Sequence, residues 1–295
     1  MPCPYIPVSG RYVSPETDRR YKMPYRMVLL EKQDGVATII LNRPGKLNAF
    51  NMEMTAEIDM AFDEAAQDRE VKAIILTGAG RTFSTGIDLN WAATVRDDEE
   101  LPSMASTVRG RMVTHSERSF MTVVLKIRSI PKPVIAAVNG IAMGGAFVLA
   151  LSCDLKVASD NAEFSLPQVK RGLIPDGAGT YLLPRAVGLT KALELALICD
   201  SIDGREAERI GLVNKVVPHD NLMAAAREMA TKIAGNAPLA VAMTKAAMHK
   251  GINEHDIAAH MDYEVYIMNI LFGTEDFKEG ISSIWEKREP VFKGR

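Results

Sequence analysis

The chain has 295 residues, of which 47% are hydrophobic and 24% are charged, and its formal net charge is -2. This ordinary balance predicts a folded protein with a large core, in one large domain or two small ones, and it implies no general attraction to nucleic acid. The three cysteines, Cys3, Cys153 and Cys199, are odd in number and far apart, which indicates a reducing compartment without a disulfide framework, so we expect a cytoplasmic location.

Residues 1–26 differ in composition from the rest of the chain. They contain four prolines before Met23 and charges of both signs, and they lack the apolar segment of a secretory signal. Glu16 and Asp18 disfavour a transit peptide, so we expect a poorly ordered N-terminal extension. The remainder divides into a core of strands and helices, residues 27–218, and a helical C-terminal region, residues 219–295.

The core begins with short elements that are separated by residues typical of turns. Two apolar runs flank Asp34-Gly35 and predict a β-hairpin. A loop rich in Pro and Gly, a helix and a buried strand are predicted next. The hairpin covers residues 27–30 and 36–41, the loop 41–50, the helix 52–68 and the buried strand 71–77.

A glycine-rich segment, residues 78–88, follows that strand. Its three glycines suggest backbone that lies close to another group, although a flexible surface loop is the alternative interpretation. Further on, the acidic run 97–100 predicts a solvated segment. Residues 108–130 then predict a helix, which the following proline ends.

The stretch 133–153 runs for 21 residues without a charge. Residues 134–138 predict a buried strand, Asn139-Gly140 predicts a turn, and the residues from Gly144 suit a buried helix. A strand, a Gly-rich turn and a helix N-terminus together leave unpaired backbone N–H groups at one point, which can hold an oxyanion. Two alternatives are an ordinary buried strand and helix, and a transmembrane helix, which the turn inside the run disfavours.

The second half of the chain is mostly helical in pattern. A strand over residues 154–158 and a loop-rich segment over 164–180 precede the helices. Strands with helices followed by a helical tail indicate an α/β protein. The expected helices cover residues 189–199, 204–210, 220–235, 238–250, 254–271 and 275–286.

Several short motifs occur in a specific order and spacing. They are Leu41-Asn-Arg-Pro44 with Leu47-Asn-Ala49, Phe83-Ser-Thr-Gly-Ile-Asp88, residues 133–145, Gly172-Leu-Ile-Pro175, Glu279-Gly280 and Glu286-Lys-Arg288. With these motifs the chain resembles the crotonase (enoyl-CoA hydratase/isomerase) superfamily over about residues 27–295. The resemblance implies a crotonase-like spiral of ββα repeats, with a helical C-terminal oligomerisation region that builds homotrimers or hexamers. It also implies an acyl-CoA thioester as the partner, and we expect neither nucleic acid nor a membrane.

The resemblance implies the positions of the site residues as well. The backbone N–H groups of Ile87 and Gly145 would hold the thioester oxygen as an enolate forms, because two fixed donors stabilise an oxyanion without reorganisation. Coenzyme A is part of the substrate, so no separate cofactor is expected, and no Cys-x-x-Cys or His-x-x-x-His spacing predicts a metal. The implied CoA contacts are Lys46, Leu47, Ala49 and, from a neighbouring subunit, Lys287. The implied substrate pocket includes Thr85, Gly86, Gly144, Val148 and Gln168.

The expected chemistry depends on one carboxylate. Hydratases of the family use two glutamates, but the matching positions here hold Val148 and Gln168, which cannot titrate. Asp176 follows Pro175, where isomerase branches carry a carboxylate, and the surrounding motif looks most like isomerases that act on the phenylacetyl-CoA epoxide. In an apolar pocket the pKa of Asp176 should rise, which suits a base near neutral pH. We therefore expect an enoyl-CoA isomerase with Asp176 as the catalytic base.

Alternatives remain for the activity and for single residues. The chain would be a hydratase or hydrolase-type crotonase if Asp176 and a partner activate water, or else a non-catalytic acyl-CoA-binding protein. Asp176 would be a turn or N-cap residue in a purely structural role. Asp88 is expected to be a local cap and His115 a surface residue. We expect residues 91–119 to shape the acyl pocket.

Overall fold

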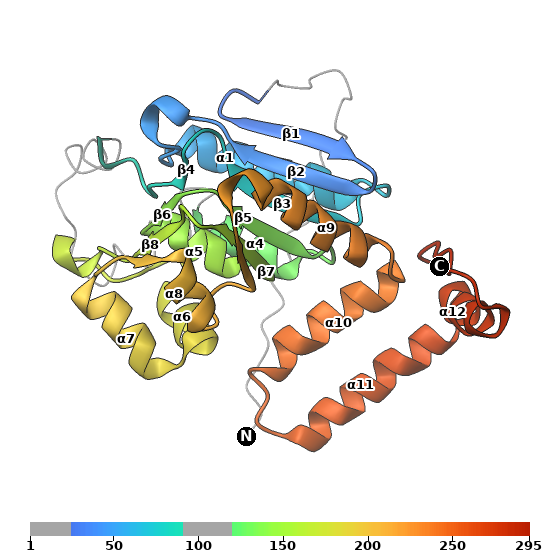
Figure 1. Cartoon of the computed structure of the whole chain (residues 1–295). Coiled ribbons are helices and arrows are strands. Elements are labelled where there is room, and N and C mark those ends of the chain that lie inside the picture. The colour runs from blue at the N-terminus through green and yellow to red at the C-terminus, as the bar shows by residue number, and fades with distance from the viewer. Residues whose placement is uncertain (1–24, 91–119) are drawn as a thin grey trace, which may run out of the picture.

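The computed structural model describes residues 25–90 and 120–295. The predictions for residues 1–24, the acidic run 97–100, His115 and the pocket segment 91–119 therefore lie outside the described residues. Figure 1 shows two β-sheets covered by helices, with the last three helices lying to one side of this body.

The larger sheet has six strands in the order β1-β2-β3-β5-β7-β10. β1 and β2 form the predicted hairpin, and the turn residues Asp34 and Gly35 both have positive φ angles. The other neighbouring strands in this sheet are parallel. The strands are β1 (Val28–Gln33), β2 (Val36–Leu41), β3 (Ala73–Gly78), β5 (Val134–Val138), β7 (Leu155–Ser159) and β10 (Lys215–Val217).

The smaller sheet has four strands in the order β4-β6-β8-β9, and the sequence pattern does not predict it. Its strands have two or three residues each, too few to show a period of two. β4, β6 and β8 each follow a strand of the larger sheet, so successive turns of the chain add one strand to each sheet, which confirms the expected spiral. The strands are β4 (Thr82–Ser84), β6 (Ile141–Met143), β8 (Glu163–Ser165) and β9 (Ile202–Asp203).

Helices cover both faces of the larger sheet and create two apolar cores. Ile74 and Leu76 of β3 lie in the main core, whereas the alternate residues Ala73 and Ile75 lie in the second core under α9. This alternation follows because successive strand side chains point to opposite faces and a parallel sheet is buried on both. The main core also receives α1 (Met52–Gln67), α4 (Phe120–Ser129) and α5 (Gly145–Ser152), and α9 spans Leu222–Ala234.

The stretch 133–153 consists of β5, a turn, β6 and α5, so the transmembrane interpretation is wrong. Among residues 25–90 and 120–295 there is no helix with the length and apolar character needed to cross a membrane. The predicted helices in the second half are confirmed with small shifts at their ends. They are α7 (Leu189–Ile198), α8 (Gly204–Arg209), α9, α10 (Pro238–Gly251), α11 (Ile257–Phe272) and α12 (Glu275–Glu286). The sequence pattern does not predict α6 (Gly179–Val187), which follows the loop-rich segment.

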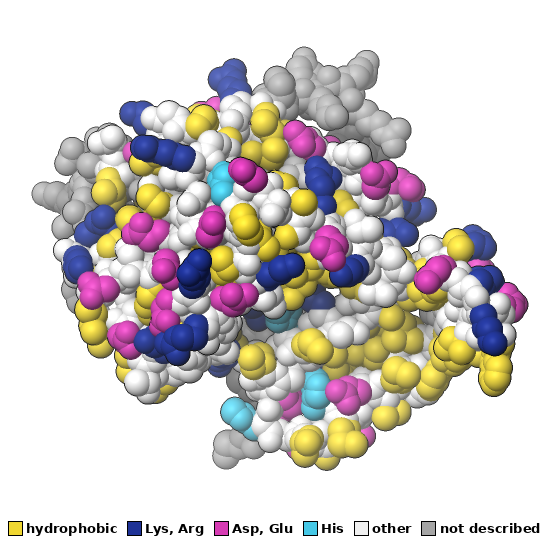
Figure 2. All heavy atoms as spheres, viewed as in Figure 1, with side chains coloured by type: hydrophobic (Ala, Val, Ile, Leu, Met, Phe, Trp, Pro, Cys, Tyr) yellow, Lys and Arg dark blue, Asp and Glu magenta, His cyan; other side chains and the backbone are white. Residues whose placement is uncertain are grey.

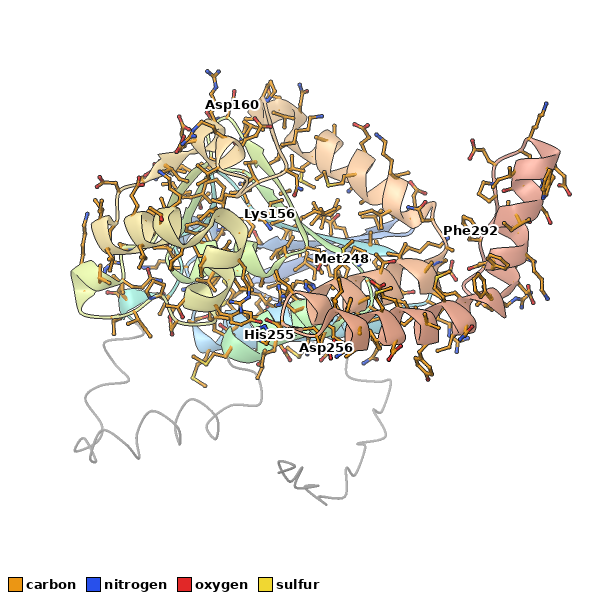
Figure 3. All side chains as sticks on the ribbon, turned by 90° about the horizontal axis from the view of Figure 1, so that it is seen from below. Lys156, Asp160, Met248, His255, Asp256 and Phe292 are labelled. Atoms are coloured by element: carbon orange, nitrogen blue, oxygen red, sulfur yellow. The ribbon has the colours of Figure 1, made fainter. Side chains whose placement is uncertain are left out.

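Buried polar contacts attach α10 to the body of the protein. Lys245 on α10 places its Nζ 2.7 Å from the Asp154 carboxylate and also donates to the carbonyl oxygen of Ile127. Nε2 of His249, one turn later, lies 3.0 Å from the other oxygen of Asp154. Figure 3 shows α10, marked by Met248, beside α11, with the turn between them at His255 and Asp256. The Asp256 side chain caps α11 by accepting from two of its first N–H groups.

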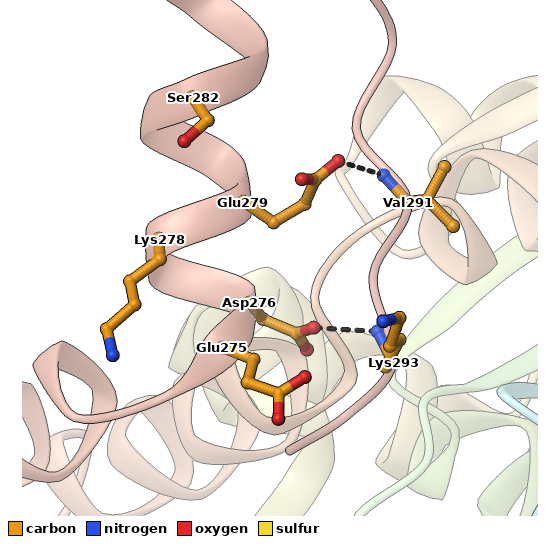
Figure 4. A pocket seen from close by; sticks show the side chains of 7 residues that line it. All are labelled: Glu275, Asp276, Lys278, Glu279, Ser282, Val291 and Lys293. Atoms are coloured by element: carbon orange, nitrogen blue, oxygen red, sulfur yellow. Dashed lines mark hydrogen bonds between the residues drawn. The ribbon is translucent and has the colours of Figure 1, made fainter.

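The C-terminal residues fold back along α12. The N–H of Lys293 donates to the Asp276 carboxylate, and the N–H of Val291 donates to Glu279 (Figure 4). The carbonyl oxygen of Arg295 accepts from the N–H of Glu275 at the start of the helix. This tail therefore pairs with side chains on α12 and with its free N-terminal N–H groups.

Candidate functional site

The N-terminus of α5 is a backbone donor site. Gly144 precedes α5 as its N-cap with φ 59°, a conformation that glycine adopts readily. Its own N–H donates to the Ser165 carbonyl, and the first helical bond runs from the Val148 N–H to the Gly144 oxygen. The N–H groups of the first turn therefore have no partners inside the helix.

The loop after β4 is held in a fixed conformation by Phe50. The N–H of Phe50 donates to the Gly86 oxygen, and the N–H of Asp88 donates to the Phe50 oxygen. Successive N–H groups point in opposite directions in extended backbone, so the Ile87 N–H faces away from Phe50. Asp88 also forms an ion pair with Arg43 at 3.3 Å and accepts from the Asn90 N–H, which supports its structural interpretation.

Gly86 brings this loop against the N-terminus of α5. A Cβ atom at Gly86 would lie 2.5 Å from the Met143 oxygen and 3.0 Å from the Gly145 nitrogen, so no side chain fits. In turn, a Cβ at Gly145 would lie 3.7 Å from Cγ1 of Ile87. Within the described ranges, neither the Ile87 N–H nor the Gly145 N–H has a protein acceptor. The structure thus brings the backbone around Ile87 against Gly145, and both N–H groups lack an acceptor among residues 25–90 and 120–295.

Asp176 lies in the loop before α6. Burial raises the pKa of the Asp176 carboxyl group, against the weaker opposing effect of its own backbone N–H. The N-cap of α6 is Ala178, and the side chain of Asp176 makes no capping hydrogen bond to this helix, so the capping interpretation of Asp176 is not supported. Asp176 is therefore a carboxylate with a perturbed pKa that has no capping role.

Phe120 connects the Asp176 loop to the two donors. A Cβ at Gly177 would clash with Cε1 of the Phe120 ring, and a Cβ at Gly145 would lie 3.6 Å from Cζ of the same ring. Sequence reasoning missed Phe120, because no spacing in the sequence relates it to Gly145 or Gly177. Only the packing of α4 against α5 brings it here.

Val148 and Gln168 lie beside the same helix terminus. Val148 is fully buried, and its Cγ2 would be 2.9 Å from a Cβ at Gly179. Gln168 is 8% exposed, and its Oε1 has no partner among the described residues. Nε2 of Gln168 is 3.7 Å from the position of a Gly144 Cβ. The structure thus brings both predicted pocket residues to α5.

The predicted CoA residues divide into two groups. Lys46, Leu47 and Ala49 lie in the turn at the end of the 3-10 helix Pro44–Lys46, and the Leu47 oxygen accepts from the Thr85 N–H. That turn is therefore attached to the loop that carries Ile87. Lys287 follows α12 as its C-cap, and Figure 1 shows α12 at the opposite end of the molecule from the small sheet, so one chain does not bring Lys287 to this site.

Known proteins resemble this chain in sequence and in fold. A family model described as enoyl-CoA hydratase/isomerase matches residues 31–295. The chain is 40% identical to a short-chain-enoyl-CoA hydratase of Clostridium acetobutylicum, over 91% of this chain and 98% of that protein. It is 36% identical to a crotonyl-CoA hydratase of Syntrophomonas wolfei, over 92% and 99% of the two chains. The crystal structure of enoyl-CoA hydratase from Bacillus anthracis superposes with a TM-score of 0.82 at 32% identity and covers 92% of this chain and all of that one.

Proposed function

Because the chain belongs to the enoyl-CoA hydratase/isomerase family, we propose that it adds water to a 2-enoyl-CoA thioester, with Asp176 as the proton-transferring residue. The observation that carries this proposal is the contact of Gly86 with the start of α5, where the N–H groups of Ile87 and Gly145 have no acceptor in the part of the chain that the structure describes. Two fixed donors in a buried site stabilise the oxygen of an enolate. The family relatives named as hydratases favour water addition over the isomerisation that the Asp176 motif predicts.

The proposed reaction balances with one carboxylate. Asp176 takes a proton from water while the water oxygen bonds to C3 of the enoyl group. The C2=C3 electron pair moves toward C1, and the negative charge that develops on the thioester oxygen is held by the N–H groups of Ile87 and Gly145. The enolate then collapses as C2 takes the proton from Asp176, which restores the carboxylate.

Double-bond migration is the second candidate activity, and one observation favours it. Val148 and Gln168 stand where family hydratases carry their glutamates, and neither can titrate. A single carboxylate suffices to move a proton between two carbons of a 3-enoyl thioester. Isomerisation uses the same enolate and the same two N–H donors.

One assay separates these activities. We expect the purified protein to convert crotonyl-CoA in D₂O to 3-hydroxybutyryl-CoA, and proton NMR monitors the reaction. 3-Hexenoyl-CoA is assayed in parallel as the substrate for double-bond migration. Double-bond migration without a hydroxylated product would instead establish the isomerase. CoA binding without any exchange or product would contradict both candidates and favour a binding protein.

We also propose that the protein assembles as a homotrimer or hexamer. Large apolar side chains are exposed along the C-terminal helices, as the yellow atoms at the lower right of Figure 2 show. A contiguous exposed apolar surface of this kind is typical of a protein interface. The most exposed of these side chains are Trp285, Ile257, Met248 and Ile284.

Light scattering tests this assembly. We expect the wild-type chain to elute with three or six times the mass of one chain. The double variant Ile284→Ser with Trp285→Ser should shift toward a single chain, because each replaced side chain removes apolar contact area. Lys232→Ser, an exposed change on α9, serves as the control. A monomeric wild-type protein at micromolar concentration contradicts the proposal.

A further inference from the structure

The Phe120 ring lies against both Gly145 and Gly177 and so forms a wall shared by the two halves of the site. Its Cε1–Cζ edge faces Gly145, which carries one free N–H, and Gly177, which follows Asp176. For a Cβ at Gly177, Cδ1 of the ring would be only 3.0 Å away, besides the clash with Cε1. Gly177 also has φ +61°, so both the backbone and the ring require glycine there.

Phe50 and the packing of α4 hold the Phe120 ring in this position. Phe50, which is 2% exposed, stacks against Phe120 with ring centroids 5.8 Å apart and an interplanar angle of 26°. Phe120 begins α4, whose side chains Val123, Val124 and Ile127 are buried in the main core. Since the partly buried Phe120 ring is backed by the buried Phe50 ring and is carried by a helix packed in the core, moving it would disturb that packing.

α4 is also tied to α1 by charges. Nζ of Lys126 lies 2.8 Å from the Asp59 carboxylate and 2.6 Å from that of Asp63. These contacts sit one to two turns after Phe120 and orient the helix. The position of the ring relative to Gly145 therefore follows from two packed helices and does not depend on the ring alone.

We propose that Phe120 is a specificity-determining residue that restricts this site to acyl groups without a branch at the α-carbon. The proposal rests on the proposed function of the site, in which the thioester oxygen binds at the Ile87 and Gly145 N–H groups. The α-carbon is then one bond from the thioester carbon and must lie between these donors and Asp176. The Phe120 edge, which lies against Gly145 and Gly177, borders that space.

The size of the effect follows from packing. Carbon atoms in contact need about 3.5–4.0 Å, and the ring would lie 3.6 Å from a Cβ at Gly145, so a single carbon fills the space between Gly145 and the ring. An extra methyl group on the α-carbon has to displace the ring or tilt the thioester away from its donors. One methyl group typically changes kcat/KM by about 10–200-fold in such a pocket.

The test compares crotonyl-CoA with 2-methylcrotonyl-CoA in each enzyme. We expect wild type to prefer crotonyl-CoA by at least ~10-fold in kcat/KM. Phe120→Leu should reduce that preference by at least ~10-fold, and Phe120→Ala should reduce it further. Phe120→Tyr keeps the ring and should keep the preference. Leu125→Ala changes an exposed residue of the same helix, 65% exposed, and should leave it unchanged.

The preference is a ratio within one preparation, so it does not depend on how much of a variant is folded. An unchanged ratio in both Phe120→Leu and Phe120→Ala overturns the proposal, and so does a wild type that favours the branched substrate. A merely structural role of Phe120 lowers both activities together and leaves the ratio where it is.

Binding of saturated thioesters separates this inference from the proposed reaction. Butyryl-CoA and 2-methylbutyryl-CoA differ only by a methyl group on the α-carbon, and calorimetry gives their Kd values without any turnover. If wild type turns over no enoyl-CoA but binds butyryl-CoA at least ~10-fold more tightly, and Phe120→Leu removes that difference, the reaction fails while the specificity role stands. If neither thioester binds, both proposals are wrong.

Discussion

Replacing Asp176 with Asn is expected to lower kcat by about 10²–10⁴-fold while acyl-CoA binding persists. The amide keeps the shape of the side chain but cannot accept and return a proton, and a positioned acid–base group contributes a factor of this size. The measurement is the initial rate with crotonyl-CoA beside the Kd for butyryl-CoA. Asp200→Asn removes an exposed carboxylate and serves as the matched control.

The pH dependence gives this prediction a second readout. Burial raises the pKa of Asp176, and the carboxylate must be ionised to act as the base. The acidic limb of kcat/KM should therefore lie above the ordinary aspartate range of about 3.9, and the limb should be absent from the residual activity of Asp176→Asn. An Asn variant within twofold of wild type would exclude Asp176 as the base.

The same pKa shift predicts that Asp176→Asn does not destabilise the fold. A carboxyl group whose pKa is raised by folding favours the protonated form in the folded state. Its contribution to stability is present below the unfolded pKa and is lost as the pH rises through the folded pKa. Near neutral pH the Asn variant should therefore unfold at the same temperature as wild type or higher, so a loss of activity is not a loss of folded protein.

Asp154→Ala is expected to give the largest loss of stability, about 3–5 kcal/mol. The side chain of Lys245 is 6% exposed and that of Asp154 is 14% exposed, so the substitution leaves a buried ammonium group without its carboxylate. Burial lowers the pKa of Lys245, and Asp154 opposes that effect. The measurement is the urea midpoint of the two proteins at one protomer concentration, since assembly would couple stability to concentration.

The pH dependence of stability and a control at an exposed ion pair test the role of Asp154 further. Burial by itself would raise the pKa of Asp154, but the hydrogen bond from His249 and the charge of Lys245 outweigh it and hold the pKa below its usual value. A lowered pKa means that the stabilisation is present above the ordinary carboxyl range and is lost as the pH falls through the lowered value. Glu228→Ala breaks an exposed pair with Lys232 and should barely move the midpoint. Equal losses in the two variants would contradict the buried role of Asp154.

Regular local patterns predicted most of the larger elements. The hairpin at Asp34-Gly35, the strand Val134–Val138 and the helix Glu275–Glu286 appear where turn residues and periodicity place them. Such signals depend on neighbours in the chain, so they can be read without the fold. Strands of two or three residues carry no such signal, and the small sheet forms because the larger strands place its pieces in register.

For the site, the sequence by itself determined the local pieces: a strand, a turn and a helix N-terminus at Gly144, a glycine at position 86, and a carboxylate at Asp176. Each depends on backbone conformation or residue type, which neighbouring residues dictate. Only the tertiary structure decided that Gly86 lies against Gly145, that the Phe120 ring lies against both Gly145 and Gly177, and that Asp154 holds α10. These contacts join residues far apart in the chain, and close packing of whole helices and loops sets them.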